Sequence, residues 1–477
     1  MATFWERIQA AAKAAYSAWQ GQSLDSPSQP LSIYTGLEDA DKQRVERYRL
    51  LWKYYKGEHK KHLKVRMTPA GAGPDDNVIV NLSRRTVNKG AAFLFGEPLT
   101  WELTEGDQTP EEKRLDEIWR SEAWKMSFLT EVALNGGVTG DAYIQIQPRE
   151  NDLPRLINLS PSIVFPHTNP DDIDDVWAYE LRWRRGQSIK RTIHAKAETG
   201  QQWEIFTETF TAGRWVSDGD AQVWPWSWPA ITHIKNLPNP NEFFGLSDLE
   251  DADLNDAINQ ASSNLNRVIR IFAHPVIWGK MMGTDSLDPS KIQMANNKDA
   301  MMDALELAKD LGSAQEYLKY LRTMWSEITQ VPENDPDRMR VGAQSGFALK
   351  VLFHELVQKT NLKRWLYGKE IIELNRRLLE MEGMGDNHVC TLHWQSPLPI
   401  NEAEMADSYK FDLEAGLASK ETVSTERGYD WETEQERMQA EQAADGNVGE
   451  MLLRAFERGA GAGPVQTPPV QANGAAQ

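Results

Sequence analysis

The chain lacks residues and segments that several protein classes require. Of its 477 residues only Cys390 is a cysteine, which excludes disulfide frameworks and cysteine-rich zinc sites and is typical of a reducing compartment. No apolar run is long enough to span a bilayer. The N-terminal sequence from Met1 to Arg7 has an early acid, and no small-residue cleavage site follows an apolar core, so no signal peptide is predicted. We expect a soluble protein made inside the cell, with no membrane partner.

Motifs for catalysis and for cofactor binding are also missing. The chain contains no G-x-x-x-x-G-K-[ST] loop to cradle phosphates and no H-E-x-x-H sequence to bind zinc. Cys390 lacks the flanking sequence of a catalytic nucleophile. We therefore predict that the protein is not an enzyme and that it has no catalytic residue, no cofactor and no bound metal.

Two short segments have residues that could ligate a metal, and each has a simpler interpretation. His59 and His62 have the spacing of a ligand pair on one helix face, but lysines lie between them and a third ligand is missing, which favours a solvated helix end. Asp171-Asp-Ile-Asp-Asp175 offers the carboxylate oxygens that calcium prefers. It lacks the glycine and the closing glutamate of a known calcium loop, so we interpret it as an acidic turn.

Basic residues are too few for an ordinary nucleic-acid binder. The formal net charge is −18, whereas proteins that hold DNA wrap its phosphates with a basic face. If DNA is a partner, the protein should not grip it tightly. Much of the acidity lies between residues 401 and 460, where fifteen Asp and Glu stand against six Lys and Arg, a net charge of −9. A weak helical pattern there predicts short, exposed helices, and the Gly, Ala, Pro and Gln beyond Gly459 predict a disordered tail.

The first half of the chain alternates between helical and strand-like patterns. Helices are predicted over residues 1–20, over Lys42–Tyr55 and over Thr86–Leu94, and Val78–Leu82 is a short β-like run. The Pro-broken cluster Trp224–Pro229 cannot be helical and is expected to cap the end of a sheet domain. β-Branched and aromatic residues between turn signals predict antiparallel strands. These strands cover Ala142–Gln147, Trp177–Trp183, Thr192–Ile193, Trp203–Phe210 and Arg214–Val216.

Two capped helices with a compact segment between them follow Pro240. The capping box Ser247-Asp-Leu-Glu250 opens the first, whose apolar residues occupy a broad arc before His274-Pro275 ends it. Strand-like Val276–Trp278 lies in the compact segment. A second capping box, Ser313-Ala-Gln-Glu316, opens the other helix, and Pro332 stops it.

A third long helical pattern spans Ser345–Met381. Gly368 is expected to interrupt it, and Gly383 is expected as its C-cap. Taken together, the patterns predict an α+β fold that is mainly α.

Three segments carry a recognisable order of motifs. The first is Asn77-Val-Ile-Val-Asn81 followed by Thr86-Val-Asn-Lys-Gly-Ala-Ala-Phe-Leu-Phe-Gly-Glu-Pro-Leu-Thr100, and the second is Asn239-Pro-Asn-Glu-Phe-Phe-Gly-Leu-Ser-Asp-Leu-Glu250 leading into Asn255-Asp-Ala-Ile-Asn-Gln-Ala-Ser-Ser263. The third is Ser345-Gly-Phe-Ala-Leu-Lys350. In this order they resemble the N-terminal signature, the start of the first stem helix and the start of the long wing helix in the portal (head-to-tail connector) family of tailed bacteriophages.

The resemblance implies the portal fold, with an α+β wing, long stem helices, a small α/β clip, a tunnel loop and a helical crown. Residues 1–245 would form the N-terminal part of the wing, 246–273 a stem helix, 274–312 the clip, 313–331 a second stem helix, 332–344 the tunnel loop, 345–400 the rest of the wing, 401–460 the crown and 461–477 a disordered tail.

The resemblance also implies a function. The protein would form a homo-oligomeric ring of about twelve subunits at one vertex of a viral capsid, assembled in the host cytoplasm, with two complementary faces on each subunit. Double-stranded DNA would pass through the ring during packaging and ejection without sequence recognition, past an acidic wall that repels phosphates. Further partners would be the terminase large subunit, a head-completion or adaptor protein, and the major capsid and scaffolding proteins.

The tunnel loop is where the resemblance implies contact with DNA. Arg338 and Arg340 are our candidates for transient phosphate contact at the narrowest point, although they could equally pair with Asp335 and Asp337 on a solvated loop. Prolines in the loop limit how far it could refold. The residues expected to face DNA are Glu333, Asn334, Asp335, Asp337, Arg338, Met339, Arg340 and Gln344.

Two other functions stay open at this point. A different minor structural protein of a phage would need an additional domain, and the chain leaves no room for one. A cellular helical adaptor with an α+β module would be a monomer or a dimer, and would leave the three ordered segments unexplained.

Overall fold

The computed structural model divides after Leu398 into two compact units. None of the helices among the described residues is both long and apolar enough to cross a bilayer. The helix expected over residues 1–20 and the tail expected over 461–477 lie outside the described residues. These are 33–34, 36–59, 63, 67–68, 71–72, 76–103, 109–149, 152–185, 188–197, 202–273, 277–280, 301–304, 311–333, 350–385, 388–398, 402–427, 431 and 433–439.

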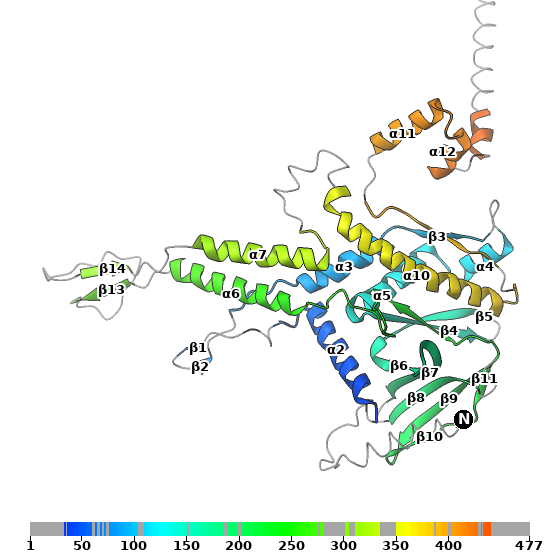
Figure 1. Ribbon diagram of the computed structural model, residues 1–477, viewed down its shortest axis with the longest axis horizontal. Helices are drawn as coiled ribbons and strands as arrows, with labels where there is room; N and C mark the ends of the chain where they lie inside the picture. Colours follow the sequence, from blue (N-terminus) through cyan, green and yellow to red (C-terminus); the bar gives the residue numbers. More distant parts are fainter. Residues whose placement is uncertain are drawn as a thin grey trace, which may run out of the picture. The chain divides into compact units, whose positions relative to one another are not determined.

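A three-stranded antiparallel sheet carries the main hydrophobic core of the first unit (Figure 1). Its order is β12 (Ile231–Lys235), β4 (Asp141–Arg149) and β5 (Asp152–Leu159). The central strand β4 is buried on both faces, since Tyr143 and Ile144 are adjacent in sequence and both are fully covered. A strand covered on both faces is expected to be a continuous apolar run rather than an alternating one.

Two helices, α5 (Glu122–Thr139) and α10 (His354–Met381), pack against this sheet, and a third, α3 (Leu82–Phe95), packs on both of them. Tyr367 and Ile371 of α10 are completely buried in the same core. The helix predicted over Thr86–Leu94 is therefore confirmed as α3, and it begins four residues earlier than expected.

A larger antiparallel sheet follows in the chain, and its strand order is β10-β9-β8-β7-β6, with β11 also paired to β9. The five predicted strand segments lie within β4, β7, β8, β9 and β10, which confirms them. A 3-10 turn, η2 (Pro161–Ile163), precedes the sheet. The strands are β6 (Val164–Asn169), β7 (Asp172–Arg185), β8 (Ser188–Lys196), β9 (Trp203–Thr211), β10 (Arg214–Ser217) and β11 (Gln222–Trp224).

The tryptophan cluster that follows β11 is not helical, as predicted. Trp224 packs against Trp226 and Trp228, with ring centroids 4.8 and 5.6 Å apart. The indole nitrogen of Trp228 donates to Glu380 of α10 at 2.8 Å. The cluster thus ties the edge of the larger sheet to the long helix.

Smaller elements complete the first unit. Helix α2 (Asp39–Lys56) confirms the helix predicted over Lys42–Tyr55. Helix α4 (Pro110–Ile118) begins with a capping box at Thr109, which sequence inspection did not identify. The remaining strand pairs are β1 (Met67–Thr68) with β2 (Gly71–Ala72), and β3 (Leu99–Glu102) with β15 (Thr391–Trp394).

Helices α6 (Asp253–Ala273) and α7 (Leu311–Thr329) run antiparallel, side by side (Figure 1). Ile258 of α6 packs with Leu321 and Trp325 of α7 in a small separate core. Between the helices, β13 (Ile277–Lys280) pairs with β14 (Met301–Ala304). The two long helices are confirmed, and α6 ends directly before His274-Pro275. Of the segment between them, only the β13–β14 pair is described.

The predicted helix starts were less accurate than the helices themselves. Ser247 is not the N-cap of α6, which begins at Asp253, but the predicted capping box does form in the preceding turn: Leu249 N–H donates to Ser247 Oγ at 2.9 Å, and Ser247 N–H donates to Glu250 Oε1 at 3.0 Å. The Ser247 hydroxyl also contacts carbonyl oxygens of α5. Ser313 is not an N-cap either, because α7 begins two residues before it. The long helix α10 begins at His354, and Lys350–Leu352, before a turn at Phe353, are helical as well. Residues 345–349 of the predicted pattern lie outside the described residues.

The two glycines of the third helical pattern behave differently. Gly383 follows α10 with a φ of 74°, and Met384 N–H donates to the Leu379 carbonyl at 3.0 Å, so the predicted C-cap is confirmed. The prediction that Gly368 interrupts the helix was wrong. Gly368 lies inside an unbroken α10, where a Cβ at this position would be in van der Waals contact with Leu392 and Trp394 of β15.

The second unit contains short helices, as predicted for its described part. They are α11 (Glu402–Glu414) and α12 (Lys420–Glu426), and the latter is capped by the Ser419 hydroxyl. Phe411 and Leu417 are 63% and 73% exposed, so these helices have little core of their own.

Candidate functional site

The helix pair α6–α7 is anchored to the rest of its unit by a polar row on one side of α6. Asn255, Asn259 and Ser263 are spaced by four residues, so they lie one above the other, and all three are fully buried. Asn259 Oδ1 accepts from Val80 N–H at 2.8 Å, and Ser263 Oγ accepts from Val78 N–H at 2.9 Å. An extended segment before α3 is thus held along the helix.

Asn255 has the most contacts in this row. Its Oδ1 accepts from the backbone N–H groups of Leu82 and Ser83, each at 3.1 Å, and from the Ser83 hydroxyl at 3.0 Å. Its Nδ2 donates to the Val80 carbonyl at 2.9 Å. Val78–Leu82 was predicted as a β-like run, and this is corrected. The segment is extended, but its partners are side chains of α6 rather than a neighbouring strand.

Charged groups continue the row toward the C-terminal part of α6. Arg267, again four residues on, binds Asp76 Oδ1 through Nε and Nη2 at 3.0 and 2.9 Å. The pKa of Asp76 is lowered, first by its hydrogen bond to Arg267. The two segments that looked most portal-like in sequence, Asn77–Asn81 and Asn255–Ser263, are therefore the two halves of one contact.

The loop that leads into α6 is held by a buried carboxylate. Asp141, at the start of β4, accepts from Tyr48 Oη at 2.6 Å, from Gly245 N–H at 2.9 Å and from His233 Nε2 at 2.8 Å. The His233 ring stacks between Tyr143 and Phe243, with centroids 4.7 and 4.6 Å away. The Phe-Phe-Gly sequence of the second portal-like segment thus fixes where α6 begins.

A buried ion triad joins α10 to the same loop. Asp248 lies 2.6 Å from Lys363 Nζ and 3.1 Å from Lys359 Nζ. Burial alone would raise the pKa of Asp248, but the two ammonium groups outweigh it and lower the pKa. Burial lowers the pKa of Lys363, against the pull of Asp248. Breaking this triad would leave a charge uncompensated in the core.

The base of the predicted tunnel loop is firmly packed. Val331 and Phe353, on its two sides, meet in one cluster with Phe93 of α3. Arg85 donates to the Pro332 carbonyl at 3.0 Å, and Arg322 of α7 pairs with Glu333. Of the residues expected to face DNA, only Glu333 is described. Asn334, Asp335, Asp337, Arg338, Met339, Arg340 and Gln344 lie outside the described residues.

The surface of the helix pair is apolar on one flank and electrically balanced. Tyr317, Tyr320 and Ile328 of α7 are 56%, 59% and 46% exposed. The expected acidic wall is not found on these two helices, since their acidic and basic residues are equal in number. They are Asp253, Asp256, Glu316 and Glu327 against Arg267, Arg270, Lys319 and Arg322.

Of the two segments with possible metal ligands, the structure describes Asp171–Asp175 in full and the other only at His59. Within the described residues, no group of three His, Cys, Asp or Glu side chains could hold an ion. The interpretation of His59 as part of a solvated helix end was wrong, because it is fully buried and its Nδ1 lies 3.1 Å from Asp256 of α6. His62 is outside the described part of the chain. Asp171 lies in the turn between β6 and β7, as predicted, whereas Asp172–Asp175 form the start of strand β7.

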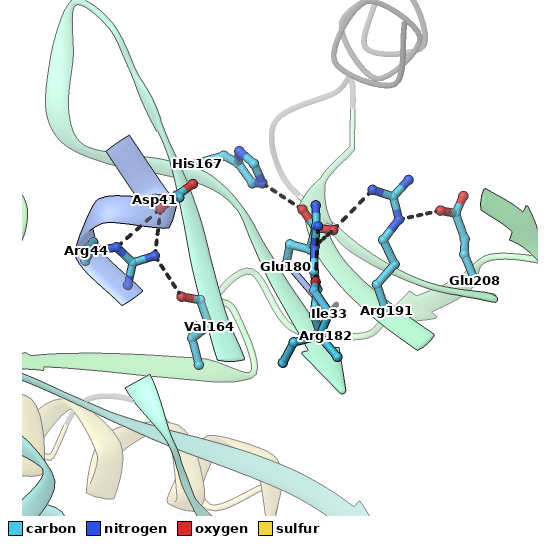
Figure 2. Close-up of polar contacts among 9 residues, drawn as sticks. All are labelled: Ile33, Asp41, Arg44, Val164, His167, Glu180, Arg182, Arg191 and Glu208. Carbon is cyan, nitrogen blue, oxygen red and sulfur yellow. Dashed lines mark hydrogen bonds and ion pairs between the residues drawn. The ribbon is translucent and has the colours of Figure 1, made fainter. Parts of the chain in front are cut away.

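The larger sheet contains a buried charge network (Figure 2). Glu180 Oε1 accepts from Arg182 Nε at 2.8 Å and from Arg191 Nη1 at 3.1 Å, while Oε2 lies 3.4 Å from His167 Nε2. Arg191 also binds Glu208 at 2.6 Å. Burial by itself raises the pKa of Glu180, but these neighbours hold it well below its usual value.

Comparison with known proteins identifies the family. The sequence pattern of the family described as "Phage portal protein, SPP1 Gp6-like" matches residues 36–447. The protein is therefore of the portal class, and it belongs to this phage portal protein family. The family is structural rather than enzymatic. No curated protein matches the chain. The predicted resemblance to the portal family and the predicted α+β fold class are both confirmed.

Solved structures give likenesses of low identity. One is a chain of the "Virion of native gene transfer agent (GTA) particle", with 14% identity, a TM-score of 0.42, and coverage of 87% of this chain and 99% of that chain. Another is from the "Neck of empty GTA particle computed with C6 symmetry", with 15% identity, a TM-score of 0.42, and coverage of 74% and 90%.

Proposed function

We propose that the protein assembles into a homo-oligomeric ring at one vertex of a phage-like capsid. The observation that carries this proposal is the apolar stripe of α7, formed by Tyr317, Tyr320, Met324 and Ile328. These residues recur at spacings of three and four, so they lie along one flank of the helix. Three of them are about half exposed, which is costly unless another surface covers them.

The second face that a ring requires is offered by α6. Asp253, Ala257 and Asn264 are exposed on the side of α6 that faces neither α7 nor the extended segment. Small and polar side chains allow a neighbouring helix to approach closely. The α7 stripe of one subunit would pack on this face of the next subunit, a head-to-tail contact that rotation can close into a ring.

The assignments of the parts follow from this arrangement and from the family. Residues 246–273 and 313–331 would be the stem helices, 274–312 the clip, and 332–344 the tunnel loop. The wing would comprise 1–245 and 345–400, and the crown 401–460. The two stem helices are balanced in charge, so a wall built from them would offer DNA little net attraction.

The ring would serve as the channel for packaging and ejection of double-stranded DNA. It would dock the terminase large subunit and then a head-completion or adaptor protein, and it would contact the major capsid and scaffolding proteins. It would assemble in the host cytoplasm and remain in the virion. The tunnel-loop residues from Glu333 to Gln344 would face the DNA as it moves.

Electron microscopy of the purified protein, with its mass measured in solution, tests the proposal. We expect rings with a central hole and about twelve subunits. Tyr317→Glu with Tyr320→Glu should abolish the rings, because it places charge inside the contact. Lys319→Gln, on the charged flank of the same helix, should leave them intact. A stable dimer without a hole would instead favour the cellular adaptor.

A further inference from the structure

A second surface of the first unit shows an unusual excess of positive charge for so acidic a chain. It is a depression of about 500 Å³ between the start of α5 and strand β5. Arg120 comes from the α4–α5 junction, Arg149 from the end of β4 and Arg155 from β5, and all three line it. Trp124 and Phe128, stacked 5.2 Å apart, form its apolar wall. We call this the arginine groove.

Two of these arginines are available for a partner. Arg149 is already bound to Asp152 at 2.8 Å. Within the described residues, neither Arg120 nor Arg155 forms an ion pair, and both are exposed. Two acids are nearby: Glu131 also lines the groove, and the charge of Arg120 helps to lower the pKa of Asp152. Arg120 is held in the left-handed region, with a φ of 60°, and its guanidinium lies 5.7 Å from the Trp124 ring centre. Planar guanidinium groups suit carboxylates, which they can bind through two hydrogen bonds.

The complementary surface is the acidic segment Asp171–Asp175, which includes the β6–β7 turn and the start of β7 and which we call the acidic turn. Asp175 pairs with Lys196 at 2.5 Å, and Asp174 lies 3.8 Å from Lys235. Asp171 and Asp172 are exposed and have no basic partner in the described part of the chain. Between these acids Ile173 is 38% exposed, so the turn offers both carboxylates and an apolar side chain.

The two surfaces lie at opposite ends of the three-stranded sheet. Asp174 of the acidic turn contacts Lys235 of β12. In the sheet, Lys235 stands opposite Asp141, the first residue of β4. The arginine groove includes Arg149, the last residue of the same strand. Nine residues of strand separate them by about 26 Å, too far for one subunit to satisfy both within itself through these groups.

We propose that the acidic turn of one subunit docks in the arginine groove of the next. The contact is head-to-tail, joins two different faces of one chain, and therefore suits a closed ring. Asp171 and Asp172 would bind Arg120 and Arg155, and Ile173 would lie against Trp124. The inference rests on the proposed ring and adds a second contact to it, separate from the helix pair.

Charge reversal on each side provides the test. The groove variant is Arg120→Glu with Arg155→Glu, and the turn variant is Asp171→Lys with Asp172→Lys. Each variant alone brings like charges together at every contact, so the protein concentration for half-assembly should rise about tenfold or more. Lys369→Glu, which reverses an exposed charge on α10, should assemble like the wild type.

Mixing the two variants gives the decisive measurement. In an equimolar mixture, a reversed groove meets a reversed turn and a native groove meets a native turn, so alternating rings should form. Sedimentation of the separate and mixed proteins shows whether assembly is recovered. Recovery supports the contact, because a misfolded subunit could not be rescued by mixing.

Three outcomes overturn different parts of the inference. Failure of the wild type to form rings overturns the proposed function itself. The docking contact is overturned if either variant alone assembles like the wild type. It is also overturned if both variants are folded and their mixture does not assemble. In both cases the proposed ring itself still stands. Should circular dichroism show that a reversal unfolds its unit, the neutral variants Arg155→Gln and Asp172→Asn are used, each with an expected weakening of about threefold.

Discussion

The side-chain amide of Asn255 donates to the carbonyl oxygen of Val80 at 2.9 Å, across 175 residues of sequence. The same side chain accepts from Leu82 and Ser83, so one asparagine satisfies the backbone where an extended segment becomes a helix. Buried backbone groups outside regular structure need such partners. The position of α6, and of the proposed stem, thus depends on a row of uncharged polar side chains.

Asn255→Ala should loosen this attachment. It leaves the backbone N–H and the hydroxyl of Ser83 without their buried acceptor, and it removes one of two partners from Leu82 N–H and from the Val80 carbonyl, which still bind each other, at a cost of about 2–3 kcal/mol. Hydrogen–deuterium exchange of peptides covering residues 78–83 should accelerate by roughly thirtyfold or more. Lys319→Gln, at an exposed position of the neighbouring helix α7, is the control. Equal exchange in both variants would contradict the anchoring role.

Glu180→Gln tests the buried charge network of the larger sheet. The substitution leaves Arg182 and Arg191 without the carboxylate between them, so we expect a loss of about 3–5 kcal/mol, seen as a lower melting temperature. Glu208→Gln, which removes a single and more exposed partner of Arg191, should cost less. If Glu180→Gln melts like the wild type, the network contributes nothing to stability.

The same network predicts a dependence on pH. The folded-state pKa of Glu180 lies well below its usual 4.5, so its stabilisation is fully present above that value. It is lost as the pH falls from about 4.5 through the folded pKa, because the unfolded state then binds the proton first. Melting temperatures of the wild type should therefore fall more steeply with acid than those of Glu180→Gln. Parallel curves would argue against the assigned pKa.

Gly245→Ala should disrupt the start of α6 more severely than its size suggests. A Cβ at this position would lie 2.4 Å from the Gly140 carbonyl oxygen, a distance that backbone atoms cannot relieve without moving. Because Gly245 N–H also binds Asp141, the loop would shift away from its carboxylate anchor. We expect a loss of more than about 2 kcal/mol and weaker ring assembly. Gly219→Ala, which would meet nothing within 4 Å, should be neutral in the same assays.

The sequence predicted elements well where a local pattern determines them. Helix α2, the strands β7 to β10 of the larger sheet and the C-cap at Gly383 follow from periodicity and turn chemistry, whereas β6 and β11 were not predicted. Prediction from the sequence failed where contacts with residues far away in the chain determine the local conformation. Val78–Leu82 has the composition of a strand, but its hydrogen bonds go to side chains of α6, which no local pattern reveals.

The same limit explains the residues that were missed at the candidate site. His59 was expected in solvent, yet it is buried, with its Nδ1 beside the carboxylate of Asp256. Asn255, Asn259 and Ser263 do carry a signal, since uncharged polar residues repeat every four positions on one side of an otherwise apolar helix. Such a row predicts a polar partner along the helix, although not which one. Asp248 and its two lysines had no such signal, because charged residues in a helix usually face water.

Removal of the loop arginines tests the proposed contact with DNA. Val331 and Phe353 pack together on the two sides of the loop, so Arg338→Ala with Arg340→Ala should leave its base and the rings intact. Packaging or retention of DNA should change, measured as the length of DNA held per particle. Lysine at both positions keeps the charge and should restore much of the function. If the arginines instead pair with Asp335 and Asp337, replacing those acids by asparagine should reproduce the defect. Normal packaging by the double alanine variant would contradict the proposed contact between these arginines and DNA phosphates.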